Sequence, residues 1–201
     1  TLVRPDSTRE FYTKHYVKAD NPIDINFVGY HSGLVDLLSY GGGGFDLAGD
    51  IRNSSGATNI DTNGAVTQSN PEALLSSREF TLTAGSAGEI IPASGAQTAP
   101  GYVPLQVNID RLLSANVTAG DLVLEQALGD LVFGDLDASG NVWLKSSGDI
   151  INDKTLSPAG DNTISAKRVT LIAENGAVGD PTATGLARSI LVDTDASAAG
   201  G

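Results

Sequence analysis

The sequence contains no cysteine and no methionine, and aromatic residues make up only 5% of its 201 residues. Without cysteine the chain has no disulfide framework, no thiolate metal site and no cysteine nucleophile. A helical bundle would need more Leu, Glu, Lys and Met than the chain offers. No apolar stretch approaches the roughly 20 residues that a membrane helix needs, so we expect no membrane span. No signal peptide is recognisable, and we expect any targeting element to lie outside this segment.

Basic side chains are also few: the chain has 12 Lys and Arg and 24 Asp and Glu, which gives a net charge of −12. Residues 1–20 hold four basic and three acidic side chains, so the negative excess falls on the rest of the chain. An acidic body of this kind repels phosphate backbones. We therefore expect no nucleic-acid partner.

Glycine is abundant, with 24 residues, and it recurs in a tripeptide of Gly, a small or acidic residue, and an aliphatic residue. Gly tolerates positive φ and Asp or Ser bonds to nearby backbone, so this composition is typical of short strands joined by tight turns. The spacing of the tripeptides varies, which fits stacked coils whose strands are fixed while their turns differ in length. The tripeptides begin at Gly49, Gly64, Gly88, Gly129, Gly148 and Gly176.

Four alternating apolar strands precede these corners, and their period of two places the outer members inward and the middle member outward. A strand this short cannot bury its inner face alone, but stacked coils share one narrow core. Asn53 and Asn152 follow their Gly-Asp-Ile tripeptides at the same offset, which predicts stacked Asn side chains along one turn. The expected outward residues of the four strands are Thr81, Val123, Trp143 and Thr170.

The pattern predicts an all-β fold, a right-handed parallel β-helix (β-solenoid) of about seven or eight coils over residues 22–195. A β-sandwich also uses short strands, but it does not predict recurrence of the same ordered unit. Residues 1–21 lack the repeat and are interpreted as a leading segment, a cap on a coil end or a docking arm. Residues 196–201 are interpreted as a linker or a truncation point.

Two segments, Gly44–Val66 and Ile164–Gly179, resemble repeats of the filamentous haemagglutinin family. The resemblance implies a large exoprotein of Gram-negative bacteria, exported by two-partner secretion, folded as a right-handed β-helix and located at the cell surface. It also implies adhesion, biofilm attachment or a stalk that presents a toxic tip. The family's secretion domain carries Asn-Pro-Asn-Gly, whereas this chain has only Asn21-Pro22-Ile23, so the resemblance is to an interior or late shaft region.

Several side chains could bind a metal ion or take part in catalysis, but we favour a structural role for each of them. The run Gly41–Asp46 resembles half of a calcium-binding nonapeptide, but a solitary copy lacks its second half, so we interpret it as a coil corner. His15 and His31 lack zinc-ligand spacing. We expect no metal, no cofactor and no catalytic residue. The Gly-Asp corners at Asp50, Asp130 and Asp149 are expected to bind backbone in turns.

Trp143 is the one candidate contact residue, because alternation places it outward, where an exposed indole is costly without a use. It could stack on a sugar or on another protein. Alternatively, the loop of residues 92–103 could fold back over it.

The main hypothesis is a structural or adhesive segment of an exported surface protein that is not an enzyme. Its partners would be a host or neighbouring cell surface, as protein or glycan, and further copies of itself or more of the same parent chain. One alternative is a self-assembling extracellular fibre whose coil ends stack. Another is a polysaccharide-active β-helix enzyme, which needs carboxylates grouped on one outward face.

Overall fold

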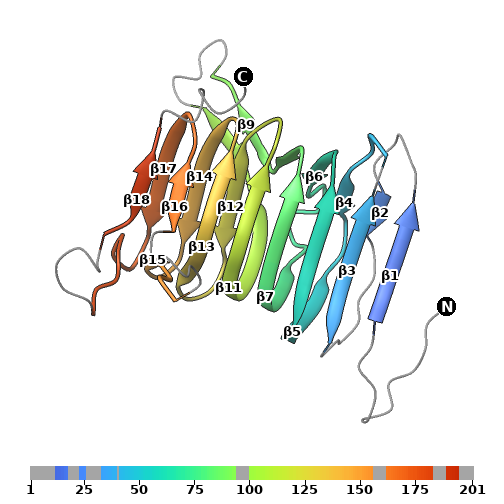
Figure 1. Cartoon of the computed structure of the whole chain (residues 1–201), viewed down its shortest axis with the longest axis horizontal. Coiled ribbons are helices and arrows are strands. Elements are labelled where there is room, and N and C mark those ends of the chain that lie inside the picture. The colour runs from blue at the N-terminus through green and yellow to red at the C-terminus, as the bar shows by residue number, and fades with distance from the viewer. Residues whose placement is uncertain are drawn as a thin grey trace.

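The computed structural model describes residues 12–17, 23–25, 33–39, 41–93, 100–155, 162–182 and 189–194, and for residues 12–17 and 23–24 it describes the backbone. These residues form strands and no helix, and the main sheet is parallel and 16-stranded. The strands stack as the rungs of a β-solenoid, from β1 at one end to β18 at the other (Figure 1). The fold predicted from the repeat is thus confirmed, with about six turns in place of seven or eight.

Three parallel ladders make up the faces of the solenoid. Face 1 contains β1 (Tyr12–Val17), β3 (Leu34–Ser39), the carboxyl-terminal halves of β5 (Ile51–Thr62), β7 (Leu75–Ala84), β11 (Leu105–Val117) and β13 (Leu131–Ala138), then β16 (Thr163–Ser165) and β18 (Leu191–Asp193). Face 2 contains β2 (Ile23–Ile25), β4 (Phe45–Leu47), β6 (Ala65–Thr67), β8 (Ser86–Ala87), β12 (Leu122–Gln126), β14 (Asn141–Ser146) and β17 (Arg168–Ala173). On face 3 the amino-terminal halves of β5, β7 and β11 pair in succession, and the amino-terminal half of β13 pairs with β15 (Ile150–Asn152); the first residues of β11 also pair with β12.

The core is built from inward columns in which each apolar side chain lies on its equivalent in the next turn. On face 1, one such column joins residues that are each 2% exposed or less, because the alternation of the strands points them all into the same narrow interior. Its members in order are Leu37, Ile60, Leu82, Ala115, Leu136 and Ile164.

Turn lengths vary while the ladders stay in register. The backbone nitrogen of Asp149 bonds to Asp130 19 residues earlier, whereas the backbone nitrogen of Ala177 bonds to Asp149 28 residues earlier. One corner carries an insertion, the antiparallel hairpin of β9 (Glu89–Ile91) and β10 (Gly101–Val103). The hairpin lengthens this corner without adding a strand to the main sheet.

Two details of the predicted repeat are wrong. The strand with Thr81 belongs to β7 on face 1, whereas the strands with Val123, Trp143 and Thr170 stack on face 2. The predicted Asn stack is also absent from the described residues, because Asn53 pairs with Ser77 and Asn152 pairs with Phe133. Each of these Asn side chains instead donates to backbone carbonyls of its own corner, as Asn53 Nδ2 does to Ala57 O at 2.7 Å.

The ends of the chain lie partly outside the described residues. Within the expected leading segment, β1 pairs in parallel with β3, so residues 12–17 add a rung to face 1. The role of residues 1–21 as a cap or docking arm stays a prediction. The backbone of His15 pairs with that of Leu37, while His31 and residues 196–201 lie outside the described residues.

Candidate functional site

An outward row of side chains crosses face 2, one from each successive rung. It runs from acidic and hydroxyl residues through an apolar and an aromatic residue to a threonine, with the hairpin inserted between the first two groups. The row is Asp46, Thr67, then Gly88 after the paired Ala87, then Val123, Trp143 and Thr170. The hairpin therefore projects between a polar part of face 2 and an apolar part whose side chains, Val123 and Trp143, are buried.

The hairpin leaves the stack at Gly88, which has a φ of +67°. A Cβ at this position would lie 2.5 Å from the carbonyl oxygen of Val123, so the next rung passes directly over it. Both the positive φ and the close backbone approach require glycine here. The sequence indicates Gly88 as the start of a corner, but the structure uses it to turn the chain away from the solenoid.

β10 folds back so that Tyr102 covers Trp143. The two rings are stacked, with centroids 4.8 Å apart and an interplanar angle of 16°. Trp143 is only 6% exposed and its neighbour Val123 is fully buried, although both lie on the outer side of the sheet. In the described residues Tyr102, from the loop that was expected to fold back, covers the indole, and a direct surface contact by Trp143 stays a prediction.

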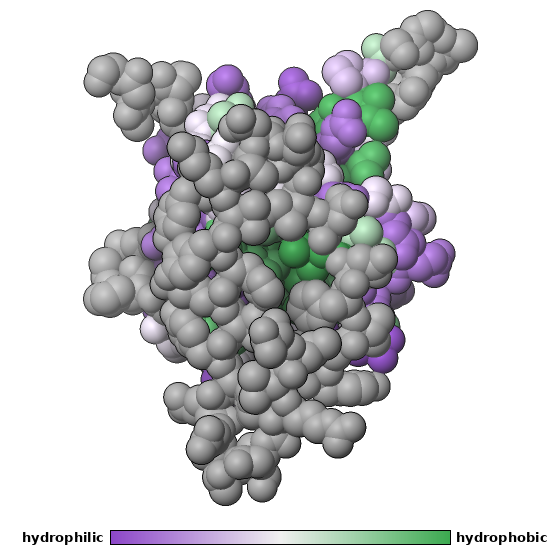
Figure 2. Space-filling model, turned by 90° about the vertical axis from the view of Figure 1, so that its right-hand side faces the viewer, coloured by the Kyte–Doolittle hydropathy of each residue, from purple (hydrophilic) through white to green (hydrophobic). Residues whose placement is uncertain are grey.

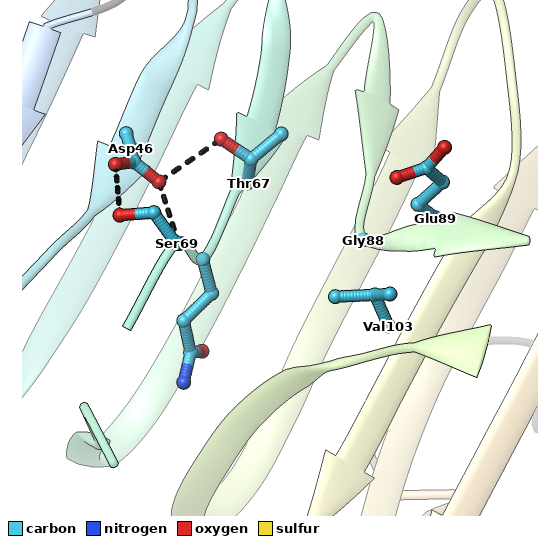
Figure 3. A pocket seen from close by; sticks show the side chains of 7 residues that line it. Asp46, Thr67, Ser69, Gly88, Glu89 and Val103 are labelled. Carbon is cyan, nitrogen blue, oxygen red and sulfur yellow. Dashed lines mark hydrogen bonds between the residues drawn. The ribbon is translucent and has the colours of Figure 1, made fainter. Parts of the chain in front are cut away.

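A cavity of about 450 Å³ lies on the polar side of the hairpin. Asp46 lines it and is held in place by its neighbours: its carboxylate accepts from Thr67 Oγ1 at 3.1 Å, from Ser69 N at 2.8 Å, and from Ser69 Oγ. Figure 3 shows these bonds on one side of the cavity, with Glu89 and Val103 from the hairpin on the other. The cavity joins two carboxylates, two hydroxyl groups and an apolar wall, a set that suits a ligand with both hydroxyl groups and apolar surface.

The same carboxylate of Asp46 belongs to the run that resembles half of a calcium-binding nonapeptide. Two of its glycines, Gly43 and Gly44, pack tightly on the next turn, because a Cβ on Gly44 would overlap the backbone of Ala65 and a Cβ on Gly64 would overlap the backbone of Gly43. The run therefore forms a close-packed coil corner. Among the residues that the structure describes, no group of three or more His, Asp or Glu side chains is placed to hold a metal ion.

The Asp residues of the Gly-Asp corners bind backbone, as predicted, and they do so in the next turn of the solenoid. Asp50 accepts from Leu74 N at 3.0 Å, Asp130 from Asp149 N at 2.8 Å, and Asp149 from Ala177 N at 2.6 Å. A hydrogen bond from Arg52, and secondarily the bond from Leu74, lowers the pKa of Asp50. These carboxylates therefore link consecutive turns of the solenoid by hydrogen bonds.

A row of charged side chains lies on face 2, two residues after Val123 and Trp143 along the same strands. Lys145 lies between Glu125 at 2.8 Å and Glu174 at 2.9 Å, and Glu125 also accepts from Gln106. Hydrogen bonds to Glu125 and then to Glu174 raise the pKa of Lys145. This row joins β11, β12, β14 and the residue that follows β17.

Exposed large apolar side chains gather at two places in the described residues, apart from Leu128 at a corner. One group is on the hairpin: Ile91, Tyr102 and Val103. The other lies at the carboxyl-terminal end of the stack: Ile172, Val178, Leu191 and Val192. Figure 2, viewed from the amino-terminal end, shows hydrophobic side chains in the central cross-section and on the projection where Figure 1 places β9.

Several members of this site are not predicted from the sequence. The sequence indicates Asp46 and Glu89 only as corner residues, and Tyr102 only as part of a loop. Their proximity depends on the hairpin folding back across face 2, for which the only sequence signal is the long interval between Gly88 and the next apolar strand at Leu105. Within the described residues no helix is long and apolar enough to cross a membrane.

Comparison with known proteins leaves this geometry as the main guide to function. The chain matches no family model, no curated protein and no solved structure.

Proposed function

We propose that the chain is a structural and adhesive shaft segment of a secreted bacterial surface protein, and that the β9–β10 hairpin makes the adhesive contact. The observation that carries the proposal is the hairpin itself, which projects from a regular stack and exposes Ile91, Tyr102 and Val103 at 36–42% each. A cluster of exposed apolar side chains with a polar rim is a common feature of binding surfaces. The proposal assigns the chain no catalytic step, cofactor or metal.

The solenoid supports the shaft part of the proposal. Each turn contacts its neighbours above and below, so the stack is a rod whose length grows with the number of turns. The hairpin is clamped to the rod by the Tyr102–Trp143 stack, so it is held as a fixed feature of one face. A rod with a rigid lateral contact point fits attachment or the presentation of a distal domain, the functions that the filamentous haemagglutinin resemblance implies.

The partner would be a protein or glycan on a host or neighbouring cell. The cavity beside the hairpin offers Asp46 and Glu89 to hydroxyl groups, while Val103 offers an apolar wall to a sugar ring or an aliphatic side chain. The net charge of −12 makes a strongly acidic partner unfavourable.

The test is attachment of beads coated with the 201-residue chain to cultured epithelial cells, with binding to a panel of immobilised glycans measured in parallel. Replacing Ile91 and Val103 together by Ser removes apolar contact surface without touching the core, and we expect at least a tenfold loss of attachment. Leu128→Ser is the matched control, because Leu128 is 64% exposed at a corner outside the hairpin. Attachment that the double variant retains in full, or that the control loses equally, would contradict the proposal.

A polysaccharide-active enzyme is the second candidate, and one observation favours it: two carboxylates, Asp46 and Glu89, line the same cavity. Paired carboxylates are the usual requirement for glycoside hydrolysis. Asp46 is engaged by Ser69 and Thr67, which suits a positioned binding group as well as a reacting one. Release of reducing ends from a glycan by the wild-type chain, abolished in Asp46→Asn and in Glu89→Gln, would favour the enzyme; glycan binding without turnover would favour the adhesive function.

A further inference from the structure

Three turns of the described chain share one hydrogen bond, in which the side-chain oxygen of the first residue accepts from the backbone nitrogen two residues later. They are formed by residues 70–72, 153–155 and 180–182. The first begins with Asn-Pro, the second with Asp-Lys and the third with Asp-Pro. Only the third therefore places a carboxyl group beside the amide of a proline, and Asp180-Pro181 is the only Asp-Pro pair in the sequence.

The bond between Asp180 and Pro181 can be broken by the carboxyl group of Asp180 itself. In its protonated form this group attacks the carbonyl carbon of its own residue, which closes a five-membered ring. The new C–O bond replaces the C–N bond to Pro181, and the proton of the carboxyl group passes to the proline nitrogen. That nitrogen belongs to a tertiary amide and leaves as a secondary amine. One water molecule then opens the cyclic anhydride and restores both carboxyl groups of Asp180.

The turn places the carboxyl group of Asp180 for this attack. Its Oδ1 accepts from Thr182 N at 2.8 Å and from Thr182 Oγ1 at 2.7 Å. A side chain that reaches the N–H group two residues later must lie on the carbonyl side of its own Cα, because the donor lies beyond that carbonyl. The five-membered ring closes on the same side. The folded chain therefore holds a conformation that an unfolded chain adopts only part of the time.

The residues around this bond are anchored on one side and open to solvent on the other. Gly179 N donates to Ile150 O at 2.8 Å, and Ile150 also pairs with Val178, so the chain enters the turn from a fixed rung. Pro181 and Thr182 are exposed, which gives water access to the anhydride. The turn thus combines a positioned carboxyl group with the second reactant that the cleavage requires.

The turn at Asp153 provides a comparison within the same molecule. Asp153 Oδ1 accepts from Thr155 N at 3.0 Å and from Thr155 Oγ1 at 2.5 Å, which is the same pair of bonds as at Asp180. The next residue is Lys154, so the amide that follows Asp153 is secondary and its nitrogen is the poorer leaving group. Cleavage is therefore expected after Asp180 and not after Asp153.

We propose that the chain cleaves itself between Asp180 and Pro181, and that the folded turn accelerates the reaction. Cleavage separates the solenoid up to Asp180 from the segment that contains β18. In the described residues this segment is held by the pairing of β18 with the three residues of β16 and by the packing of Ile190 against the core. The reaction uses no residue of the hairpin, so it is independent of the attachment proposed above.

The first measurement is intact-mass spectrometry of the purified 201-residue chain during incubation at physiological temperature. The pH is the lowest at which circular dichroism still shows the wild-type fold, so that the carboxyl group is protonated as often as the fold allows. We expect two fragments, residues 1–180 and residues 181–201, formed at least about ten times faster than from the same chain in urea at the same pH. An intact folded chain, or equal rates with and without urea, would overturn the proposal.

Three variants assign the reaction to the named groups. Asp180→Asn removes the attacking carboxyl group and Pro181→Ala replaces the tertiary amide by a secondary one, so each should stop the cleavage at this bond. Thr182→Pro removes both the N–H group and the hydroxyl group that hold Asp180, and its rate should fall to that of the wild type in urea. Circular dichroism verifies that the variants are folded, as expected for substitutions in an exposed turn.

Two results would contradict the role of the turn. Thr182→Pro that cleaves as fast as the folded wild type would show that the turn does not place the carboxyl group. Cleavage after Asp153 at the rate seen after Asp180 would show general hydrolysis of the chain. Attachment to cells is measured separately with the uncleaved Pro181→Ala chain, so either proposal can fail alone.

Discussion

The ring of Tyr102 stacks on the indole of Trp143 at a centroid distance of 4.8 Å, and this contact fixes the only antiparallel element of the described residues to the parallel stack. β9 and β10 have no ladder partner in the solenoid, so the side-chain stack takes the place of the backbone bonds that hold every rung. Aromatic pairs contribute about 0.5–1.5 kcal/mol beyond the burial of their surface. The stack is therefore a principal contact that positions the proposed adhesive surface.

Tyr102→Ala should release the hairpin and expose Trp143. Since the chain has a single Trp, its emission reports on this site directly. We expect a red-shifted emission maximum and stronger quenching by acrylamide, while circular dichroism stays that of the wild type because the rungs are intact. Tyr102→Phe keeps the ring and should behave like the wild type; emission unchanged in Tyr102→Ala would show that other contacts hold the hairpin.

Gly64→Ala should destabilise the solenoid by about 1–3 kcal/mol or more, measured by urea unfolding. A Cβ at this position would lie 2.4 Å from the carbonyl carbon of Gly43 and 2.5 Å from Gly44 N, and backbone atoms at a packed corner cannot move aside cheaply. Gly42→Ala is the matched control, because a Cβ there meets no atom within 4 Å, and we expect a change within about 0.5 kcal/mol. Equal effects of the two substitutions would contradict the tight stacking of this corner.

Leu144→Ala and Leu171→Ala remove the same atoms from adjacent rungs of one column. Leu144 is fully buried, so its truncation should cost about 2–5 kcal/mol in the free energy of unfolding. Leu171 lies in the last rung of face 2 and is only partly buried, so at low protein concentration its truncation should cost clearly less. Chemical denaturation of both variants measures the gradient, and equal costs would mean that the last rung is covered in solution.

Asp50 should make stability depend on acid. The hydrogen bond from Arg52 holds the folded-state pKa of Asp50 below its unfolded value, so the stabilisation is present above about pH 4 and is lost as the pH falls through the folded-state pKa. We expect Asp50→Asn to be less stable than the wild type at neutral pH and the difference to shrink in acid. Urea unfolding across this range measures it. In an Arg52→Gln background the acid-dependent part should be smaller, and a difference that grows in acid would refute the assignment.

Local chemistry determines where this chain forms strands and where it forms corners. Glycine corners, Asp that bonds to backbone, and alternation of apolar residues all act over a few neighbouring residues, so a parallel solenoid could be predicted from them. Asp50, Asp130 and Asp149 were correctly assigned to corners because a short acidic side chain beside Gly has backbone donors within reach.

Which corner and which strand stack on which could not be predicted from the same pattern. Gly64, Gly88 and Gly129 begin similar tripeptides, yet Gly64 packs on Gly43, Gly88 opens the hairpin, and Gly129 lies beneath Gly148. The strand of Thr81 resembles that of Val123 in sequence but lies on face 1. The pattern could not distinguish the two, because the alternation of side chains is the same on every face of a solenoid. Register is decided by packing between turns, which no short segment encodes.

The sequence by itself determined that Trp143 lies on the outer side of a strand, because strand periodicity fixes the side to which each residue points. Only the tertiary structure decided that Tyr102 covers it, and that Asp46 and Glu89, far apart in the sequence, line one cavity. The exposed ends of the inward columns at Val178 and Val192 likewise exist only in the folded stack. The side to which a residue points follows from the backbone geometry of its own strand, whereas its burial depends on which distant segments pack over that strand.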